Sequence, residues 1–289
     1  MLSLNSVAED PVALLPPLRE VIAAAELAAK KSLGQNFLLD LNLTRRIARS
    51  VEGLGEGTVI EVGPGPGGLT RALLLEGAQH VVAIERDSRA VAALQPLVGA
   101  AGQRLTLIEG DALTFDYQAT PAPRRIVANL PYNIGTPLLI GWLEHSGDFA
   151  SLTLMFQKEV ADRLLAAPGS KTYGRLSVMA QWRCDVQRVM DLPARAFTPP
   201  PKVDSSVVQF IPRVFAPTAD ADWKAMERVV AAAFGQRRKM LRSALKSLYP
   251  DPESLLRQAG LDPTARAEEI PVAGYVRLSQ VWCATRPAA

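Results

Sequence analysis

The chain has 289 residues, of which 48% are hydrophobic and 21% charged, a composition typical of a globular protein with a sizeable core. No apolar run approaches the roughly 20 residues of a membrane-spanning helix, and the start of the chain lacks the features of a secretory signal. The two cysteines, Cys184 and Cys283, are isolated, which argues against structural zinc or a disulfide framework. These features predict a cytoplasmic protein that holds no metal.

The formal net charge of +3 is unevenly distributed along the chain. From Val214 to the end there are 11 Lys and Arg against 8 Asp and Glu, so this segment carries the whole excess. A basic C-terminal region on a neutral body indicates an anionic partner.

The first 29 residues are predicted to form an extension with one short helix. Pro17 suits the first turn of a helix, and apolar residues recur at helical spacing from Leu18 to Ala29. We expect this helix to pack on the body of the protein. Further along, Asp40 has the position of an N-cap for a helix over residues 41–51.

From Thr58 onward the pattern alternates between strand and helix. Expected strands are Thr58–Val62, His80–Ile84, Arg104–Ile108, Arg125–Ala128 and Ser151–Phe156, and expected helices are Leu69–Glu76, Asp87–Val98, Thr136–Glu144 and Lys158–Ala167. This alternation predicts parallel βαβ units, whose ligands bind at the carboxyl ends of the strands. Asp185–Leu192 and Ser205–Ile211 resemble paired terminal strands, with a stiff extended loop over Phe197–Lys202 between them.

The last part of the chain is predicted to be helical. After a linker over residues 212–217, helices are expected at Asp222–Phe234, Arg237–Leu248, Pro252–Ala259 and Val272–Ala284. The predicted domains are therefore the extension (1–29), an α/β domain (30–213) and a small helical domain (214–289).

A glycine-rich turn follows the first strand of the α/β pattern. Gly63, Gly65 and Gly68 satisfy G-x-G-x-x-G, which is also the fingerprint of dinucleotide-binding proteins. Pro64 and Pro66, however, lack the backbone N–H groups that a pyrophosphate requires. The turn thus favours S-adenosylmethionine, which has no phosphate, over a nicotinamide cofactor. A glycine-rich turn without any ligand is the remaining alternative.

Acidic residues lie where that cofactor would need them. Glu61 stands at the end of the first strand and can face a cationic ligand. Glu85 follows the second strand and can accept from ribose hydroxyls, while Asp111 follows the third and can accept from the adenine amino group. All three strand ends meet at one edge of a parallel sheet.

Asn129-Leu130-Pro131-Tyr132 ends the fourth strand at the same edge. The Asn129 amide oxygen is a neutral acceptor, and Pro131 biases Leu130 to an extended conformation that can turn its carbonyl outward. Tyr132 adds a flat aromatic face. Two acceptors beside an aromatic ring suit an exocyclic amino group on a planar base, whereas the alternative is a plain tight turn.

The helix expected at Arg237–Leu248 would place Arg238, Arg242 and Lys246 on one face. These cations can contact phosphates of RNA and so position it without reading its sequence. The alternative is a basic face that is merely solvated.

Four segments, taken together and in this order, resemble one enzyme family. They are Leu33–Leu38 (LGQNFL), Glu61–Gly65 (EVGPG), Asn129–Tyr132 (NLPY) and Phe197–Ser205 (FTPPPKVDS). They are similar to motifs of the ribosomal RNA adenine N6-dimethyltransferases, and the likeness extends from about Lys30 to the C-terminus. The extension before Lys30 is longer than the usual start of that family.

The resemblance implies a class I, Rossmann-like methyltransferase with a seven-stranded, mostly parallel sheet and a small all-α C-terminal domain. It implies S-adenosylmethionine-dependent dimethylation of N6 of two adjacent adenosines in a hairpin near the 3′ end of small-subunit rRNA. The expected partner is a partly assembled 30S particle, and the expected enzyme is a monomer. A large-subunit rRNA adenine methyltransferase and a non-catalytic RNA-binding factor on the same fold are the alternatives.

The resemblance also assigns roles to single residues. The predicted cofactor residues are Asn36, Leu38, Gly63, Glu85, Asp111 and Asn129. The predicted catalytic residues are Asn129, Leu130, Pro131, Tyr132 and Phe197, with Tyr132 and Phe197 stacking on the target base unless Phe197 is only a hydrophobic plug. The predicted RNA contacts are Arg237, Arg238, Lys239, Arg242 and Lys246.

Overall fold

The structure is a computed structural model that describes residues 9–27, 29, 35–131, 134–214 and 221–285. The chain forms two compact units, each with its own buried apolar core. The first unit comprises Met1–Leu138, Asp148–Lys158 and Val189–Gln209, and the second comprises Leu139–Gly147, Glu159–Arg188 and Phe210–Ala289. The predicted domain limits at 29/30 and 213/214 stay predictions, since the compact units divide the chain differently.

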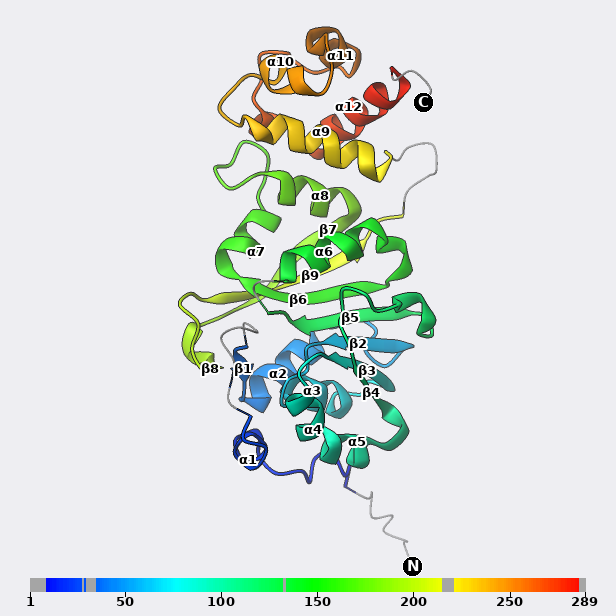
Figure 1. The fold of residues 1–289 in the computed structure, drawn as a ribbon, viewed down its shortest axis with the longest axis vertical. Coiled ribbons are helices and arrows are strands. Elements are labelled where there is room, and N and C mark those ends of the chain that lie inside the picture. The colour runs from blue at the N-terminus through cyan, green and yellow to red at the C-terminus, as the bar shows by residue number, and fades with distance from the viewer. Residues whose placement is uncertain (1–8, 28, 30–34, 132–133, 215–220, 286–289) are drawn as a thin grey trace, which may run out of the picture. The chain divides into compact units, whose positions relative to one another are not determined.

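The described part of the N-terminal extension packs against the rest of the first unit, as expected, but its helix is shorter than predicted. Helix α1 spans Leu18–Ala24 (Figure 1), and the chain turns away at Glu26, whose φ of 47° is incompatible with a continuing helix. Leu18 is buried, and the buried Arg71 donates to the carbonyl of Pro16 over 2.9 Å. An ion pair of 2.8 Å between Asp10 and Arg104 holds the segment before the helix.

A seven-stranded sheet runs through the fold in the order β4-β3-β2-β5-β6-β9-β7. The pairs β4–β3, β3–β2, β2–β5 and β5–β6 are parallel, which confirms the predicted βαβ units. The strands are β2 (Thr58–Val62), β3 (His80–Glu85), β4 (Leu105–Glu109), β5 (Arg124–Asn129), β6 (Ser151–Gln157), β7 (Cys184–Leu192) and β9 (Ser205–Pro212). Because β2 connects to β3 on one side and lies beside β5 on the other, the direction of winding reverses at β2.

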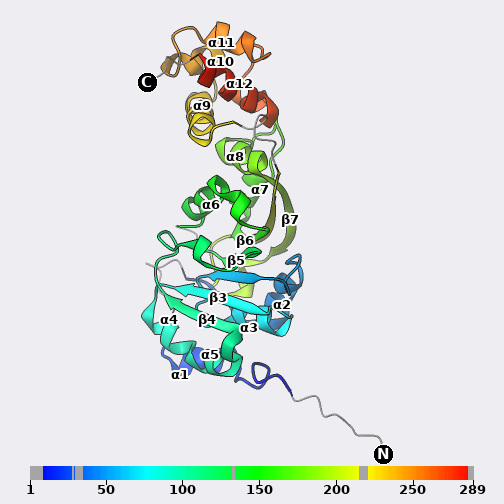
Figure 2. The ribbon, with the colours of Figure 1, turned by 90° about the vertical axis from the view of Figure 1, so that its right-hand side faces the viewer.

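Short helices precede or follow the parallel strands along the chain (Figures 1 and 2). They are α2 (Leu41–Arg49), α3 (Gly68–Leu75), α4 (Ser88–Ala93), α5 (Gln95–Ala101) and α6 (Gly135–Glu144). Asp40 caps α2 as predicted, accepting from the N–H of Asn42 over 2.8 Å. The single helix predicted over Asp87–Val98 is in fact two, because Pro96 has no N–H to donate and therefore starts a new helix.

Two further strands, β1 (Phe37–Leu38) and β8 (Phe197–Thr198), form a small antiparallel sheet that the sequence did not reveal. Each strand is only two residues long, which is too short to show a period. The predicted extended loop at Phe197 is thus partly a strand, which joins the segment before α2 to the segment before β9.

The second unit contains helices with a shared core. They are α7 (Lys158–Leu164), α8 (Arg175–Arg183), α9 (Trp223–Gly235), α10 (Leu241–Ala244), α11 (Pro252–Gln258) and α12 (Val272–Ala284). The rings of Trp182 in α8 and Trp223 in α9 stack with centroids 5.6 Å apart. Helix α8 was not predicted. Within the described ranges, none of the helices has the length and apolar character needed to cross a membrane.

The predicted continuous helix over Arg237–Leu248 is wrong. Helix α9 ends at Gly235, the next residues form a turn, and Met240 is extended and bridges to Arg266. Helix α10 begins only at Leu241, whose N–H donates to the carbonyl of Ala265, and a 3₁₀ turn follows at Leu245–Ser247. Arg238, Arg242 and Lys246 therefore do not line one face of a regular helix.

Candidate active site

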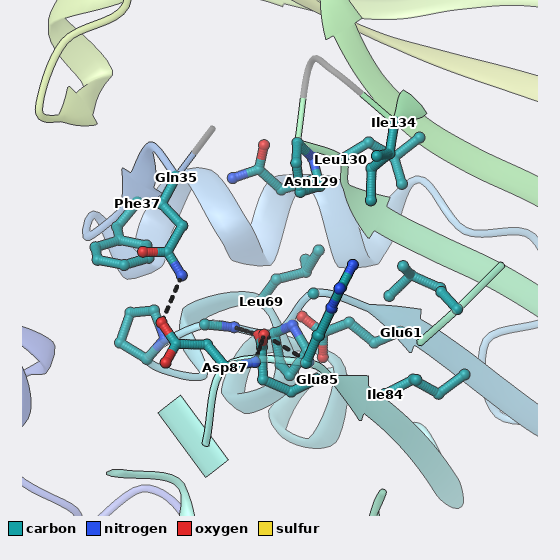
Figure 3. Close-up of a pocket in the computed structure, with 18 of the residues that line it drawn as sticks. Gln35, Phe37, Glu61, Leu69, Ile84, Glu85, Asp87, Asn129, Leu130 and Ile134 are labelled. Carbon is teal, nitrogen blue, oxygen red and sulfur yellow. Dashed lines mark hydrogen bonds between the residues drawn. The ribbon is translucent and has the colours of Figure 1, made fainter. Parts of the chain in front are cut away.

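A pocket lies at the carboxyl ends of the parallel strands, on both sides of β2, where the winding reverses (Figure 3). It is lined by Gln35–Leu38, Glu61–Pro66, Gly68, Leu69, Ile84–Asp87, Gly110–Leu113, Asn129–Pro131 and Ile134. The six predicted cofactor residues all lie in this lining, as do Leu130 and Pro131. The structure thus brings together side chains from segments more than 90 residues apart in sequence.

The backbone N–H groups of the glycine turn after β2 already donate to acceptors within the protein. The N–H of Gly63 donates to the carbonyl of Ile84 at 2.9 Å, and that of Gly67 donates to the carbonyl of Pro64 at 2.9 Å. The N–H of Gly65 donates to Glu85 Oε2 at 3.0 Å. With these donors engaged and no N–H on the two prolines, the turn is not a cradle for a pyrophosphate.

The same turn needs glycine for space as well as for conformation. Gly65 has a φ of 53°, and a Cβ there would lie 3.1 Å from the ring of Phe37. A Cβ at Gly68 would lie 2.7 Å from the carbonyl oxygen of Leu38. Strand β1 therefore lies directly against the glycine turn and closes one wall of the pocket.

Glu85, the last residue of β3, is held by three backbone N–H groups. Its Oε2 accepts from Gly65, and its Oε1 accepts from Arg86 at 2.8 Å and from Asp87 at 2.9 Å. Burial raises the pKa of the Glu85 carboxyl, and these backbone donors partly oppose that rise. The carboxylate is consequently fixed in position at the pocket wall before any ligand arrives.

Glu61 is the most deeply buried acid of the pocket, with 1% of its surface exposed. Its Oε2 has no hydrogen-bond partner among the described residues, although a buried polar atom normally has one. Burial raises the pKa of Glu61 to about 8, Thr70 beside the carboxyl partly opposes the rise, and the nearby charge of Glu85 adds to it. An orphaned carboxyl oxygen in a pocket is what a cationic ligand would satisfy.

The charge of the lining suits such a ligand. The lining contains four carboxyl groups, those of Glu61, Glu85, Asp87 and Asp111, and one guanidinium, that of Arg86. Asp111 Oδ1 accepts from the N–H of Leu113 at 3.0 Å, and Oδ2 lies 3.3 Å from the Arg86 guanidinium. S-adenosylmethionine carries a sulfonium and an ammonium and no phosphate, so the residues present fit this cofactor.

Asn129, the last residue of β5, holds its amide in a defined orientation. Its Nδ2 donates to the backbone carbonyl of Asn36 over 3.1 Å. With the nitrogen turned to that carbonyl, Oδ1 is directed elsewhere, and it accepts nothing from the described residues. Figure 3 shows the amide between the Gln35–Phe37 segment and Leu130, so the oxygen is an available acceptor at the pocket.

Of the two aromatic residues predicted to stack on the target base, the structure describes one. Tyr132 lies outside the described residues. Phe197 is 2% exposed and belongs to the apolar core of the first unit, in register with Leu38. In this structure it plugs the core beside β1 and does not line the pocket, so its stacking on a base stays a prediction that requires the ring to move.

The basic segment, residues 236–246, belongs to the second unit. Arg237 donates to the carbonyl of Lys171 at 2.7 Å, and Arg242 lies 3.3 Å from Glu253, so both have partners within the unit. Arg238, Lys239 and Lys246 are exposed and make no ion pair with any described residue. These last three are the cations best placed to meet an external anion.

Gln35 and Asp87 are among the lining residues that sequence reasoning did not assign to the site. Gln35 lies inside the LGQNFL motif, but no residue pattern shows which group its amide contacts. Asp87 was seen only as the start of a helix. Its position two residues after Glu85, at a strand end, is the signal that could have drawn attention to it.

The profile of the ribosomal RNA adenine dimethylase family matches residues 26–282. A protein of Rhodospirillum rubrum named ribosomal RNA small subunit methyltransferase A is 60% identical over 278 residues, which are 96% of this chain and 96% of its own. That alignment is longer than residues 30–289 alone, so this relative shares most of the N-terminal extension. A protein of the same name from Paramagnetospirillum magneticum is 60% identical over 267 residues, 92% of this chain and 94% of its own.

Solved structures give the same answer. A dimethyladenosine transferase from Plasmodium falciparum superposes with a TM-score of 0.72 at 26% identity, covering 83% of this chain and 94% of that one. The 23S rRNA methyltransferase ErmE superposes with a TM-score of 0.64 at 28% identity, covering 86% of this chain and 100% of that one. The chain belongs to the ribosomal RNA adenine dimethylase family, and it is therefore an S-adenosylmethionine-dependent methyltransferase that acts on rRNA.

Proposed function

We propose that the chain dimethylates N6 of two adjacent adenosines in the hairpin near the 3′ end of small-subunit rRNA. The relatives at 60% identity are named for the small subunit and align over nearly the whole chain. The observation in the structure that supports the proposal is the oriented amide of Asn129, which lines the pocket and whose oxygen accepts no hydrogen bond from the described residues.

The chemistry of adenine explains why an amide suffices. The N6 lone pair is delocalised into the ring, so the amino group is a poor nucleophile. Asn129 Oδ1 and the Leu130 carbonyl accept its hydrogens and favour a pyramidal nitrogen whose lone pair can point at the methyl group. The bound cofactor supplies an electrophilic methyl on its sulfonium, and the protein contributes positioning and oriented dipoles.

No carboxylate or histidine is required as a strong base in this arrangement. The product of transfer is an ammonium attached to an aromatic ring, which is acidic and loses its proton readily. After the first transfer, the amine has one hydrogen fewer, so one of the two acceptors is left unused in the second. A neutral amide tolerates this loss better than a buried carboxylate would.

The remaining cofactor contacts follow from the pocket walls. We assign Glu85 to the ribose hydroxyls, because its carboxylate is already fixed by three N–H groups. Asp111 is assigned to the adenine amino group of the cofactor, and Glu61 to its cationic methionine end. Asn36, Leu38 and Gly63 also line the pocket, and we assign them to the border of that same end.

RNA reaches the pocket as an unstacked base, which costs a few kcal/mol. Stacking on Tyr132 would return about 1–3 kcal/mol. Arg238, Lys239 and Lys246 are proposed to contact phosphates, with Arg237 and Arg242 contributing through their exposed sides. We propose a monomer that acts in the cytoplasm on a partly assembled 30S particle.

The second candidate is methylation of large-subunit rRNA, which the likeness to ErmE keeps in view. One experiment separates the two. RNA from a strain lacking the gene is digested and its methylated adenosines are mapped by mass spectrometry, with the gene restored as control. Loss of two adjacent N6,N6-dimethyladenosines from small-subunit rRNA supports the proposal, and loss of a mark from large-subunit rRNA alone replaces it with the rival.

A further inference from the structure

Residues 35–38, which we name the strap, cross the pocket from one wall to the other. Gln35 and Asn36 line the pocket, and Phe37 and Leu38 form β1. Its contacts reach the end of β3, the glycine turn after β2 and the end of β5. A segment with such contacts can make the cofactor site and the catalytic amide form together.

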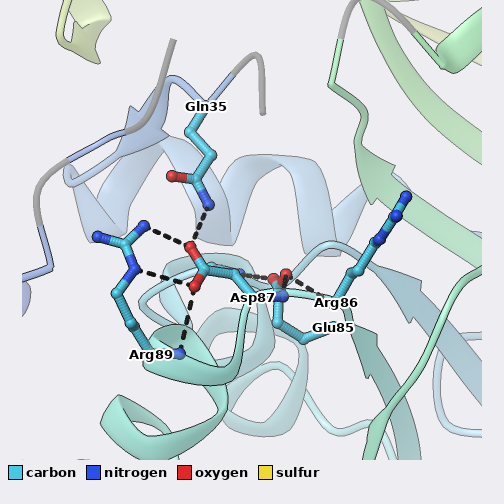
Figure 4. Close-up of polar contacts among 6 residues, drawn as sticks. Gln35, Glu85, Arg86, Asp87 and Arg89 are labelled. Atoms are coloured by element: carbon cyan, nitrogen blue, oxygen red, sulfur yellow. Dashed lines mark hydrogen bonds and ion pairs between the residues drawn. The ribbon is translucent and has the colours of Figure 1, made fainter. Parts of the chain in front are cut away.

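The first contact is between the Gln35 side chain and Asp87 (Figure 4). Gln35 Nε2 donates to Asp87 Oδ2 over 3.1 Å, across 52 residues of sequence. Arg89 pairs with the same carboxylate, at 3.0 Å from its Nε to Oδ1 and 2.6 Å from its Nη2 to Oδ2. The Arg89 guanidinium and the Gln35 amide together lower the pKa of Asp87, so the acceptor stays ionised at neutral pH.

The second contact is at the opposite wall. The carbonyl of Asn36, the next residue, accepts from Asn129 Nδ2 and thereby turns Asn129 Oδ1 away. Adjacent residues of the strap thus contact the turn that holds Glu85 and the amide proposed to accept from the target base. Displacing Gln35 would move the carbonyl that orients Asn129.

The third contact is apolar and lies beneath the strap. Phe37 belongs to a buried cluster with Leu27, Ala90 and Ala93, so the end of the N-terminal extension and α4 support it. Its ring also lies against Gly65. Backbone pairing of Leu38 with Phe197 completes the support. These contacts hold the strap's C-terminal half, whereas hydrogen bonds of Gln35 and Asn36 hold its N-terminal half.

We propose that Gln35 is a positioning residue, which acts through Asp87 to hold the strap against the cofactor and to keep the Asn129 amide aimed at the target base. The part of this proposal that concerns Asn129 rests on the proposed function, whereas the part that concerns cofactor binding does not.

A double-mutant cycle on cofactor affinity tests the part of the proposal that concerns cofactor binding. Gln35→Ala removes the amide that donates the hydrogen bond, and Asp87→Ser removes the carboxylate that accepts it. Serine at position 87 can still cap α4 and donate its backbone N–H to Glu85. Affinity for S-adenosylhomocysteine is measured by calorimetry. We expect each single variant to bind about tenfold more weakly and the double variant to bind no more weakly than either, because a hydrogen bond to a charged group is lost only once.

Arg89→Met is the comparison variant, since it removes the guanidinium that pairs with the same carboxylate and leaves the Gln35 amide in place. We expect its affinity for S-adenosylhomocysteine to stay within twofold of the wild type. Binding by Gln35→Ala within twofold of the wild type would overturn the proposal. So would a double variant whose loss equals the product of the two single losses, because independent effects multiply.

Turnover separates this proposal from the proposed function. At saturating cofactor, Gln35→Ala should lower kcat on rRNA several-fold, whereas a contact that serves only cofactor binding would raise KM alone. An unchanged kcat would remove the link to Asn129 and confine Gln35 to the cofactor. If the wild type methylates no small-subunit rRNA, the proposed function fails, while the binding cycle still decides the role of Gln35.

Discussion

The cofactor pocket and the basic segment are the two functional regions that the sequence predicts, and they are built in opposite ways. In the pocket, the decisive groups are held by hydrogen bonds: the buried Glu85 by three N–H groups and the half-buried Asn129 by the carbonyl of Asn36. In the basic segment, Arg238, Lys239 and Lys246 are exposed and make no ion pair with the described residues. A pre-organised site should lose function steeply on single substitutions, while an exposed set of charges should lose it gradually.

The steepest loss is expected at Asn129. Asn129→Ala removes the acceptor for the amino group, and loss of one such oriented group costs about 10²–10³ in rate. Single-turnover methyl transfer at saturating cofactor measures the effect, and calorimetry with S-adenosylhomocysteine should show a much smaller loss of affinity. Turnover close to normal would exclude the amide as acceptor.

The next largest effect is expected at the end of β3. Glu85→Ala removes the carboxylate that three N–H groups hold, and we expect affinity for the cofactor to fall at least tenfold, as for a lost hydrogen bond to a charged group. Glu109→Ala is the matched control, because Glu109 pairs with Glu85 in register on β4 but does not line the pocket. Equal losses in the two variants would show that the effect belongs to the sheet edge in general.

We expect Glu61 to give the free energy of unfolding and the cofactor affinity a pH dependence of intermediate size. Its pKa of about 8 in the folded protein exceeds the usual 4.5, so the unfolded chain binds fewer protons between these values. The free energy of unfolding should therefore decrease as pH rises from about 4.5 to 8. A cation bound beside Glu61 favours the ionised form, so affinity for S-adenosylmethionine should rise with pH over the same window, by up to about tenfold per pH unit.

Glu61→Gln cannot ionise, so this variant tests whether Glu61 causes the pH dependence of stability and that of cofactor affinity. It should flatten both the pH dependence of the free energy of unfolding and that of cofactor affinity. Chemical denaturation and calorimetry at pH 6, 7 and 8 provide the measurements. A wild-type affinity that does not change with pH would mean that Glu61 does not face the cation.

The smallest single effects are expected in the basic segment. Arg238→Ala, Lys239→Ala and Lys246→Ala should each lower the slope of log affinity for rRNA against log salt by about 1, the effect of one lost phosphate contact. Arg237→Ala is the comparison, because its guanidinium already binds the carbonyl of Lys171. Arg237→Ala should lower the midpoint of thermal unfolding and should change the salt slope by less than the other three variants do. Equal salt slopes in all four variants would contradict the assignment.

The same contrast explains how far the sequence could be interpreted. In the pocket, glycines, prolines and acids mark strand ends, and parallel strands bring their ends to one edge whatever the details of packing. That is why Gly63, Glu85, Asp111 and Asn129 could be grouped in advance. The strap could be placed only in part, because the Gln35–Asp87 hydrogen bond joins residues 52 apart and leaves no periodic trace.

In the basic segment, the sequence prediction failed on local structure. The run from Arg237 to Leu248 has helical spacing, but long-range bonds decide its backbone: Leu241 donates to Ala265, and Met240 bridges to Arg266. Spacing alone cannot reveal partners that lie 24 and 26 residues away. The charges remain exposed in the observed turn, so the functional prediction does not depend on the helix.

The account makes its most direct claim about the product of the reaction. Purified protein with isotopically labelled S-adenosylmethionine is given small-subunit particles from a strain lacking the gene, and the labelled nucleosides are identified by mass spectrometry, with Asn129→Ala in parallel. We predict that the label appears in N6,N6-dimethyladenosine at two adjacent positions of the hairpin and is nearly absent with Asn129→Ala. Label on another atom or another RNA, or equal labelling by the two proteins, would contradict the account.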